Sequence, residues 1–123
     1  WVRICNDLSL SLEAIIASDK LSQKGLKVAV ANIHTLKPLD TSFIIKHAQK
    51  VSAIITAENH SIIGGLGSAV AETLIEGNVS RKFKRIGIED TFAEGGSTDF
   101  LFKKYGLTST KIISELEKLL SSN

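Results

Sequence analysis

The sequence predicts a single α/β domain, a three-layer α/β/α sandwich around a mainly parallel sheet of four or five strands. Short apolar, β-branched runs alternate with segments of helical period along the 123 residues. Two runs, Val28–Ala31 and Ala53–Ile55, are apolar at every position, as expected for strands covered by helices on both faces. The composition agrees, since 43% hydrophobic and 23% charged residues are typical of a globular domain.

The four expected strands are short and lie between helical segments. They are Val2–Cys5, Leu26–Ala31, Val51–Thr56 and Phe83–Ile88. Alternation of strand and helix is typical of parallel pairing, because each helix carries the chain back to start the next strand. We therefore expect one compact core and one domain over residues 1–123.

The first two helices are marked by caps and by apolar spacing. The first is expected between Asp7 as N-cap and Gly25 as its end. Its predicted core-facing residues are Leu8, Leu12, Ile15 and Ile16. The second is expected after Pro38, with Asp40 as N-cap. Its predicted inward residues are Ile44, Ile45 and Ala48.

Three further helices are expected in the second half of the chain. The third carries Leu66, Val70 and Leu74 at four-residue intervals and stops at Gly77-Asn78. A short helix is predicted near residues 97–104, with a stop at Gly106. The last helix should close the core with an apolar stripe: Ile112, Ile113, Leu116, Leu119 and Leu120.

Charge and cysteine content narrow the class of protein. The net charge of +2 is spread along the sequence, so neither a nucleic-acid nor a membrane partner is predicted. The basic stretch Arg81–Arg85 is interpreted as a solvated entry to an edge strand, with a phosphate-contacting patch as the alternative. The lone Cys5 favours a cytoplasmic protein without disulfides. Because the chain starts at Trp1, we expect a fragment of a longer protein or a split subunit.

The glycine-rich segment after the third strand is the first candidate site. Gly64, Gly65 and Gly67 join a buried strand to a helix, and free amides at a helix start attract anions. The alternative is that these glycines only permit a sharp turn and close packing. The segment lacks the Lys-Ser/Thr of a P-loop and the G-x-G-x-x-G spacing of dinucleotide sites, so nucleotide binding is not predicted.

Two ionisable residues precede these glycines. Glu58 and His60 are two positions apart, so in an extended loop they can form a carboxylate–imidazole pair. The alternative is that His60 is a surface or interface group with Glu58 nearby. The predicted anion or interface loop therefore comprises Glu58, His60, Gly64, Gly65 and Gly67. No catalytic residue is predicted.

The second candidate segment follows the last strand. Asp90 and Glu94 could in principle bind a metal, and Ser97 can cap the next helix. Two carboxylates without an Asp-x-Asp pattern are more often solvated or capping groups. No metal site is therefore predicted.

Three blocks of the sequence resemble the transketolase C-terminal domain. They are Leu36–Asp40, Glu58–Val70 and Lys104–Thr108, and they occur in the family's order. The resemblance extends from about Leu8 to Leu120. It implies a mixed, mainly parallel sheet, in which an antiparallel strand lies upstream of this chain.

The resemblance also implies a function and partners. Enzymes of the family transfer two-carbon ketol units between sugar phosphates, using thiamine diphosphate and magnesium held by two other domains. The chain is then a non-catalytic structural and interface domain that binds no cofactor itself. Its expected partners are the cofactor-binding domains or subunit of the same enzyme, in a homodimer or a heterotetramer.

Two alternatives remain open. The equivalent domain of a 2-oxoacid dehydrogenase E1 β subunit or of deoxyxylulose-phosphate synthase has a similar architecture. A stand-alone regulatory module could instead capture a phosphate or carboxylate metabolite at the turn from Gly64 to Gly67.

Overall fold

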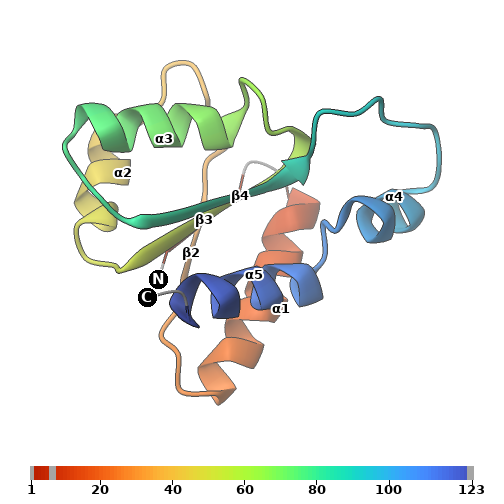
Figure 1. Cartoon of the computed structure of the whole chain (residues 1–123), viewed down its shortest axis with the longest axis horizontal. Helices are drawn as coiled ribbons and strands as arrows, with labels where there is room; N and C mark the ends of the chain where they lie inside the picture. The colour runs from red at the N-terminus through yellow and green to blue at the C-terminus, as the bar shows by residue number, and fades with distance from the viewer. Residues whose placement is uncertain (1, 6–7, 122–123) are drawn as a thin grey trace.

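The computed structural model describes residues 2–5 and 8–121, with the side chains of residues 9–121. The elements in chain order are β1 (Val2–Cys5), α1 (Leu8–Gln23), β2 (Ala29–Asn32), α2 (Thr41–Ala48), β3 (Ala53–Ser61), α3 (Leu66–Glu76), β4 (Lys82–Ile88), α4 (Thr98–Tyr105) and α5 (Ser109–Ser121). Each predicted strand and helix is present, although the ends differ (Figure 1). Asp7, the predicted first N-cap, lies outside the described residues.

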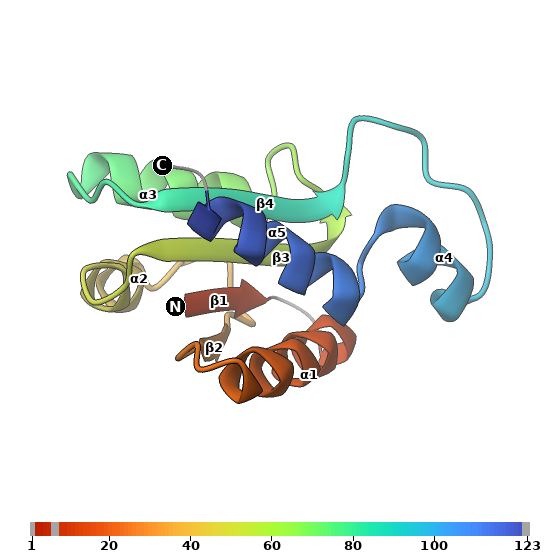
Figure 2. The same cartoon turned by 60° about the horizontal axis from the view of Figure 1, so that its bottom comes forward.

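The four described strands form one sheet in the order β2-β1-β3-β4, and all three pairings are parallel. The order reverses direction between β1 and β3, where ligand sites of open α/β sheets usually lie. β4 is an edge strand of this sheet (Figure 2). The predicted α/β fold is therefore confirmed.

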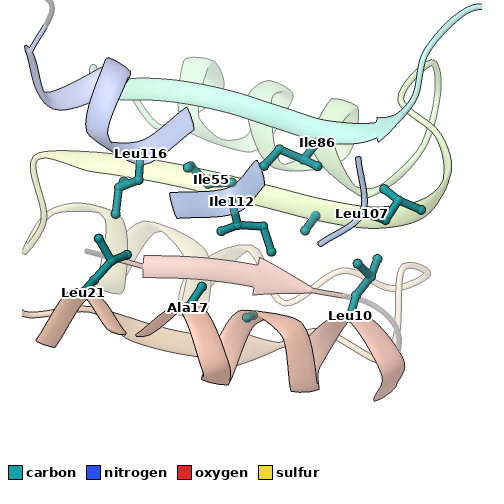
Figure 3. Packing of buried hydrophobic residues seen from close by; sticks show 10 residues of the cluster. Leu10, Ala17, Leu21, Ile55, Ile86, Leu107, Ile112 and Leu116 are labelled. Carbon is teal, nitrogen blue, oxygen red and sulfur yellow. The ribbon is translucent and has the colours of Figure 1, made fainter. Parts of the chain in front are cut away.

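Helices cover both faces of the sheet, and β3 supplies both cores. Ile55 and Ala57 face the layer of α1 and α5, whereas Ile54 faces α2 and α3. The first core also contains Ile112 and Leu116 of α5, as predicted from the apolar stripe of the last helix (Figure 3). The three layers of the sandwich follow from this alternation of side chains along one buried strand.

The predicted core face of α1 is wrong at Leu12 and Ile15, whereas Ile16 is partly buried and the Leu8 side chain lies outside the described residues. The structure buries Leu10, Ala14, Ala17 and Leu21. Leu12 and Ile15, which were expected inside, are 59% and 48% exposed. Small alanines let α1 approach the sheet and α5 closely, so the turns that carry them form the contact face (Figure 3).

The predicted helix caps are mostly confirmed. Asp40 Oδ1 accepts from the Phe43 amide at 2.9 Å, and Ser97 Oγ accepts from the Phe100 amide at 3.3 Å. Gly106 adopts φ +69°, a left-handed conformation that ends α4 without strain. These local signals set the ends of α2 and α4.

The segment from Glu89 to Phe100 is exposed throughout and, with α4, extends away from the sandwich (Figures 1 and 2). None of the α4 residues is buried. Across the described ranges, no helix has the length and apolar character that crossing a membrane requires.

Candidate functional site at the carboxyl edge of the sheet

The third strand is longer than predicted and carries two of the candidate residues. β3 runs to Ser61, which pairs with Ile88, and the Ile62 amide donates to the Ile88 carbonyl at 2.9 Å. Glu58 and His60 therefore lie in a strand, and their predicted placement in a loop is wrong. Pairing with β4 keeps the backbone extended beyond the point where the apolar run ends.

Glu58 is a buried carboxylate at the start of α3. Its side chain is 0% exposed, and its two oxygens accept from the amides of Leu66 at 2.8 Å and Gly67 at 2.9 Å. A negative charge at a helix N-terminus satisfies amides that have no partner within the helix. The anion that binds these two amides is thus the chain's own carboxylate.

His60 lies next to this carboxylate in sequence but has other partners. The imidazole is exposed, and its Nδ1 accepts from the Ser61 amide at 3.0 Å. This bond requires an unprotonated Nδ1, so the Nε2 atom carries the proton in the neutral ring. The two side chains therefore hold separate backbone amides and do not form the predicted pair.

The glycines fit the turn for different reasons. Gly64 has φ +71°, which favours glycine, but a Cβ there would meet nothing within 4 Å. A Cβ on Gly65 would collide with Glu58 Oε2 and lie 2.7 Å from the Ser61 carbonyl oxygen. A Cβ on Gly67 would lie 2.7 Å from Arg85 Cδ. Gly65 thus gives the room that lets Glu58 reach the helix, and Gly67 gives room for the Arg85 side chain.

Arg85 of β4 fixes the turn from the side and was missed by the sequence analysis. Its Nη1 donates to the Ile62 carbonyl at 2.8 Å and to Ser68 Oγ at 3.2 Å. Ser68 Oγ also accepts from the Gly64 amide at 3.1 Å. The sequence does show a cation, Arg85, within the fourth predicted strand. In the structure Arg85 pairs with the buried Thr56 of the neighbouring strand.

The second candidate segment has its own ion pair. Glu94 pairs with Lys104, and the Glu94 amide donates to Tyr105 Oη at 3.2 Å. Over the described part of the chain, no group of three or more His, Cys, Asp or Glu residues could hold a metal ion. Phe92, in the same segment, is fully exposed.

Comparisons with known proteins relate the chain to a family. A model of the transketolase C-terminal domain matches residues 9–112. A 6-deoxy-6-sulfo-D-fructose transketolase subunit of Clostridium sp. (strain MSTE9) is 46% identical over 101 residues, which are 82% of this chain and 31% of that protein. A 1-deoxy-D-xylulose-5-phosphate synthase of Heliobacterium modesticaldum is 37% identical over 107 residues, which are 87% of this chain and 16% of that protein.

A solved structure gives the same result. A split-gene transketolase, described as an inactive β4 tetramer, superposes with a TM-score of 0.84 at 35% identity, over 98% of this chain and 38% of that one. The chain thus spans less than a third of the Clostridium subunit and about a sixth of the synthase. Because the family model covers most of the sequence, the chain belongs to the transketolase C-terminal domain family.

Proposed function

We propose that the chain is a structural and interface domain of a thiamine-diphosphate-dependent transketolase and is not catalytic alone. The complete enzyme transfers two-carbon ketol units between sugar phosphates. The observation that carries the proposal is the 46% identity to a transketolase subunit over 82% of this chain, which covers only 31% of that subunit. We assign the cofactor-binding domains to the part of the complete enzyme that this chain does not match. A cytoplasmic location and a role in the pentose phosphate pathway are part of this proposal.

The turn at Glu58 does not fit a site for thiamine diphosphate and magnesium. A magnesium-bound diphosphate needs free oxygen ligands and free anion-binding amides. At the carboxyl edge, the buried oxygens of Glu58 already accept from the Leu66 and Gly67 amides. We therefore assign no cofactor step to these residues and place the cofactor in the other domains.

The carboxyl edge supports the interface role. Ile63, in the turn before α3, is 61% exposed, and Phe92, after β4, is fully exposed. Exposed large apolar side chains that gather on one surface are typical of sites that bind another domain. We propose that the cofactor-binding part of the same enzyme covers them, in a homodimer or a heterotetramer. The split-gene neighbour is itself described as a tetramer, which supports assembly from several chains.

A chimera tests the proposal. Residues 9–112 of this chain replace the matching segment of the Clostridium subunit, and ketol transfer and oligomeric mass are measured with that enzyme's other components. We expect assembly and ketol transfer to be retained, whereas the subunit cut before this segment loses both. A folded chimera that does not assemble, or a truncated subunit with full activity, would contradict the interface role.

A matched pair of substitutions locates the interface within the chimera. Ile63→Lys introduces a charge at the carboxyl edge and is expected to weaken assembly about tenfold or more. Ile75→Lys introduces the same charge near the end of α3, at the opposite edge, where Ile75 is 77% exposed. We expect Ile75→Lys to assemble normally. Equal loss in both variants would count against the carboxyl edge.

Deoxyxylulose-phosphate synthase is the second candidate for the complete enzyme. The 37% identity to the Heliobacterium synthase favours it specifically. The two candidates differ in the substrates of the complete enzyme, so assaying the full gene product for ketol transfer and for deoxyxylulose-phosphate synthesis separates them. The stand-alone anion module at Gly64–Gly67 has less support, since Glu58 holds two of the turn's amides.

A further inference from the structure

A cavity of about 380 Å³ lies along the outer edge of β4, and Ile62 and Arg85 belong both to its lining and to the turn at the Glu58 site. Residues 84–87 of β4 form one wall, and the end of α4 and the first turns of α5 close the others. Five of its lining residues are basic: Lys84, Arg85, Lys103, Lys104 and Lys111. Two are acidic, Glu89 and Glu115. The lining therefore carries an excess of positive charge.

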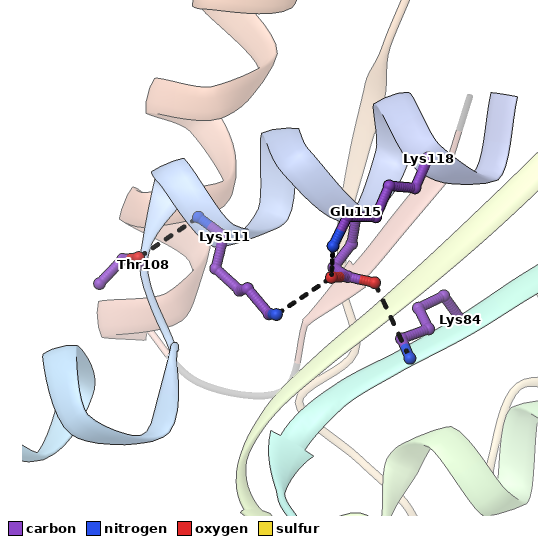
Figure 4. Close-up of polar contacts among 5 residues, drawn as sticks. All are labelled: Lys84, Thr108, Lys111, Glu115 and Lys118. Atoms are coloured by element: carbon purple, nitrogen blue, oxygen red, sulfur yellow. Dashed lines mark hydrogen bonds and ion pairs between the residues drawn. The ribbon is translucent and has the colours of Figure 1, made fainter. Parts of the chain in front are cut away.

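Three lysines surround Glu115, which is only 9% exposed. Its carboxylate pairs with Lys111 at 3.0 Å and Lys118 at 3.1 Å, and Lys84 Nζ lies 3.8 Å away (Figure 4). The hydrogen bond from Lys111, joined by the bond from Lys118, lowers the pKa of Glu115 against the opposing effect of burial. One ionised carboxylate thus faces three ammonium groups, which leaves about two positive charges unmatched.

Two of these ammonium groups line the cavity. Lys84 Nζ is beyond hydrogen-bonding distance of Glu115 and keeps its donors, and Lys111 has two further donors beside its bond to Glu115. Lys118 contacts the same carboxylate but does not line the cavity. Two of the three ammonium groups around Glu115 therefore line this partly open cavity.

The other lining side chains differ in whether their hydrogen-bond donors are already used. Tyr105 Oη accepts from the Glu94 amide, so its hydroxyl hydrogen is left for another acceptor. Arg85 already donates to the Ile62 carbonyl and to Ser68, and Lys104 pairs with Glu94. Lys84, Lys111 and Tyr105 thus each keep a donor for an additional acceptor.

We propose that this cavity binds a phosphate group, with Lys84 and Lys111 as its charged ligands and Tyr105 as a neutral donor. A phosphate carries close to two negative charges at neutral pH and accepts several hydrogen bonds, which suits the two lining ammonium groups of Lys84 and Lys111. The volume is in the range of small-metabolite sites. The proposal does not rest on the proposed function, and its three ligands are not residues that hold the Gly64–Gly67 turn.

Titration of the purified chain, whose two cores are formed by its own residues, tests the proposal. Inorganic phosphate and ribose 5-phosphate are added at constant ionic strength, and amide shifts are followed by NMR at Gly87, Gly106 and Lys111. We expect saturable shifts at these amides with at least one of the two compounds. Tighter binding of ribose 5-phosphate identifies a sugar phosphate as the source, and equal binding identifies phosphate itself. No saturable shift with either compound would overturn the proposal.

Three lysine variants separate the site from general surface charge. Lys84→Gln and Lys111→Gln are each expected to weaken binding about tenfold, as expected for loss of one charge-assisted contact. Lys118→Gln removes the same charge from the same carboxylate outside the cavity, and we expect less than about a twofold change. Equal weakening by all three variants would show non-specific attraction and contradict the site.

Discussion

Two carboxylates, Glu58 and Glu115, are buried on opposite sides of the sheet and are neutralised in different ways. Glu58 accepts from two backbone amides of α3, which have no other partner in the helix. Glu115 is shared by three lysines, whose charges exceed its own. The first arrangement is complete within the chain, whereas the second retains positive charge for a ligand. A helix start that looks like an anion site can therefore already hold an internal anion.

The largest expected effect comes from removing Glu58. Glu58→Ala leaves the Leu66 and Gly67 amides buried without acceptors, and we expect unfolding free energy to fall by about 3 kcal/mol. Urea denaturation measures this change. His60→Ala is the matched control, because His60 is exposed and its Nδ1 holds only the Ser61 amide, and we expect a change below about 0.5 kcal/mol. Similar losses in both variants would remove the distinction between them.

The glycines give a slightly smaller effect through the same carboxylate. Gly65→Ala places a methyl group against Glu58 Oε2 and the Ser61 carbonyl, so we expect a loss of about 2–3 kcal/mol. Gly64→Ala has open space around its Cβ and should cost about 1 kcal/mol, through its positive φ alone. Thermal unfolding of both variants provides the comparison. If Gly64→Ala were the more damaging, the turn and not Glu58 would control this region.

The smallest expected effect concerns Glu115 and depends on pH. The lysine contacts lower the pKa of Glu115 below its usual 4.5, so its ion pairs stabilise the fold fully above that value. This stabilisation is lost as pH falls through the lowered pKa. We expect Glu115→Gln to cost about 1 kcal/mol at pH 7 and to differ less from the unsubstituted chain at pH 3. A difference that does not shrink in acid would contradict the ionised state of Glu115.

The sequence predicted the elements well but not every face that they bury. The apolar runs and caps such as Asp40 and Gly106 act within a few residues, and they correctly placed the helices and strands. In α1, apolar residues occupy more than one face, so spacing alone favours the large side chains Leu12 and Ile15. The structure buries the face with Ala14 and Ala17, because small residues allow closer packing against the sheet and α5.

The role of Glu58 could be predicted only in part. Both halves of the interaction were visible, an anion-attracting helix start and a carboxylate eight residues before it. The sequence did not show that β3 continues past Thr56, which places the Glu58 side chain beneath the first turn of α3. The three lysines around Glu115 come from β4 and α5, so their meeting depends on how the sheet and the last helix pack.

Chemical rescue of Glu58→Ala is the most direct test of the internal anion. Acetate has the size of the deleted CH₂–COO⁻ group and can fill the space that this variant leaves. We predict that acetate raises the melting temperature of Glu58→Ala above its value in chloride of equal ionic strength, increasingly with concentration as mass action requires. The unsubstituted chain should show no such difference between the two salts. Absence of rescue, or an equal rise in both proteins, would contradict the assignment of Glu58 as the anion that completes α3.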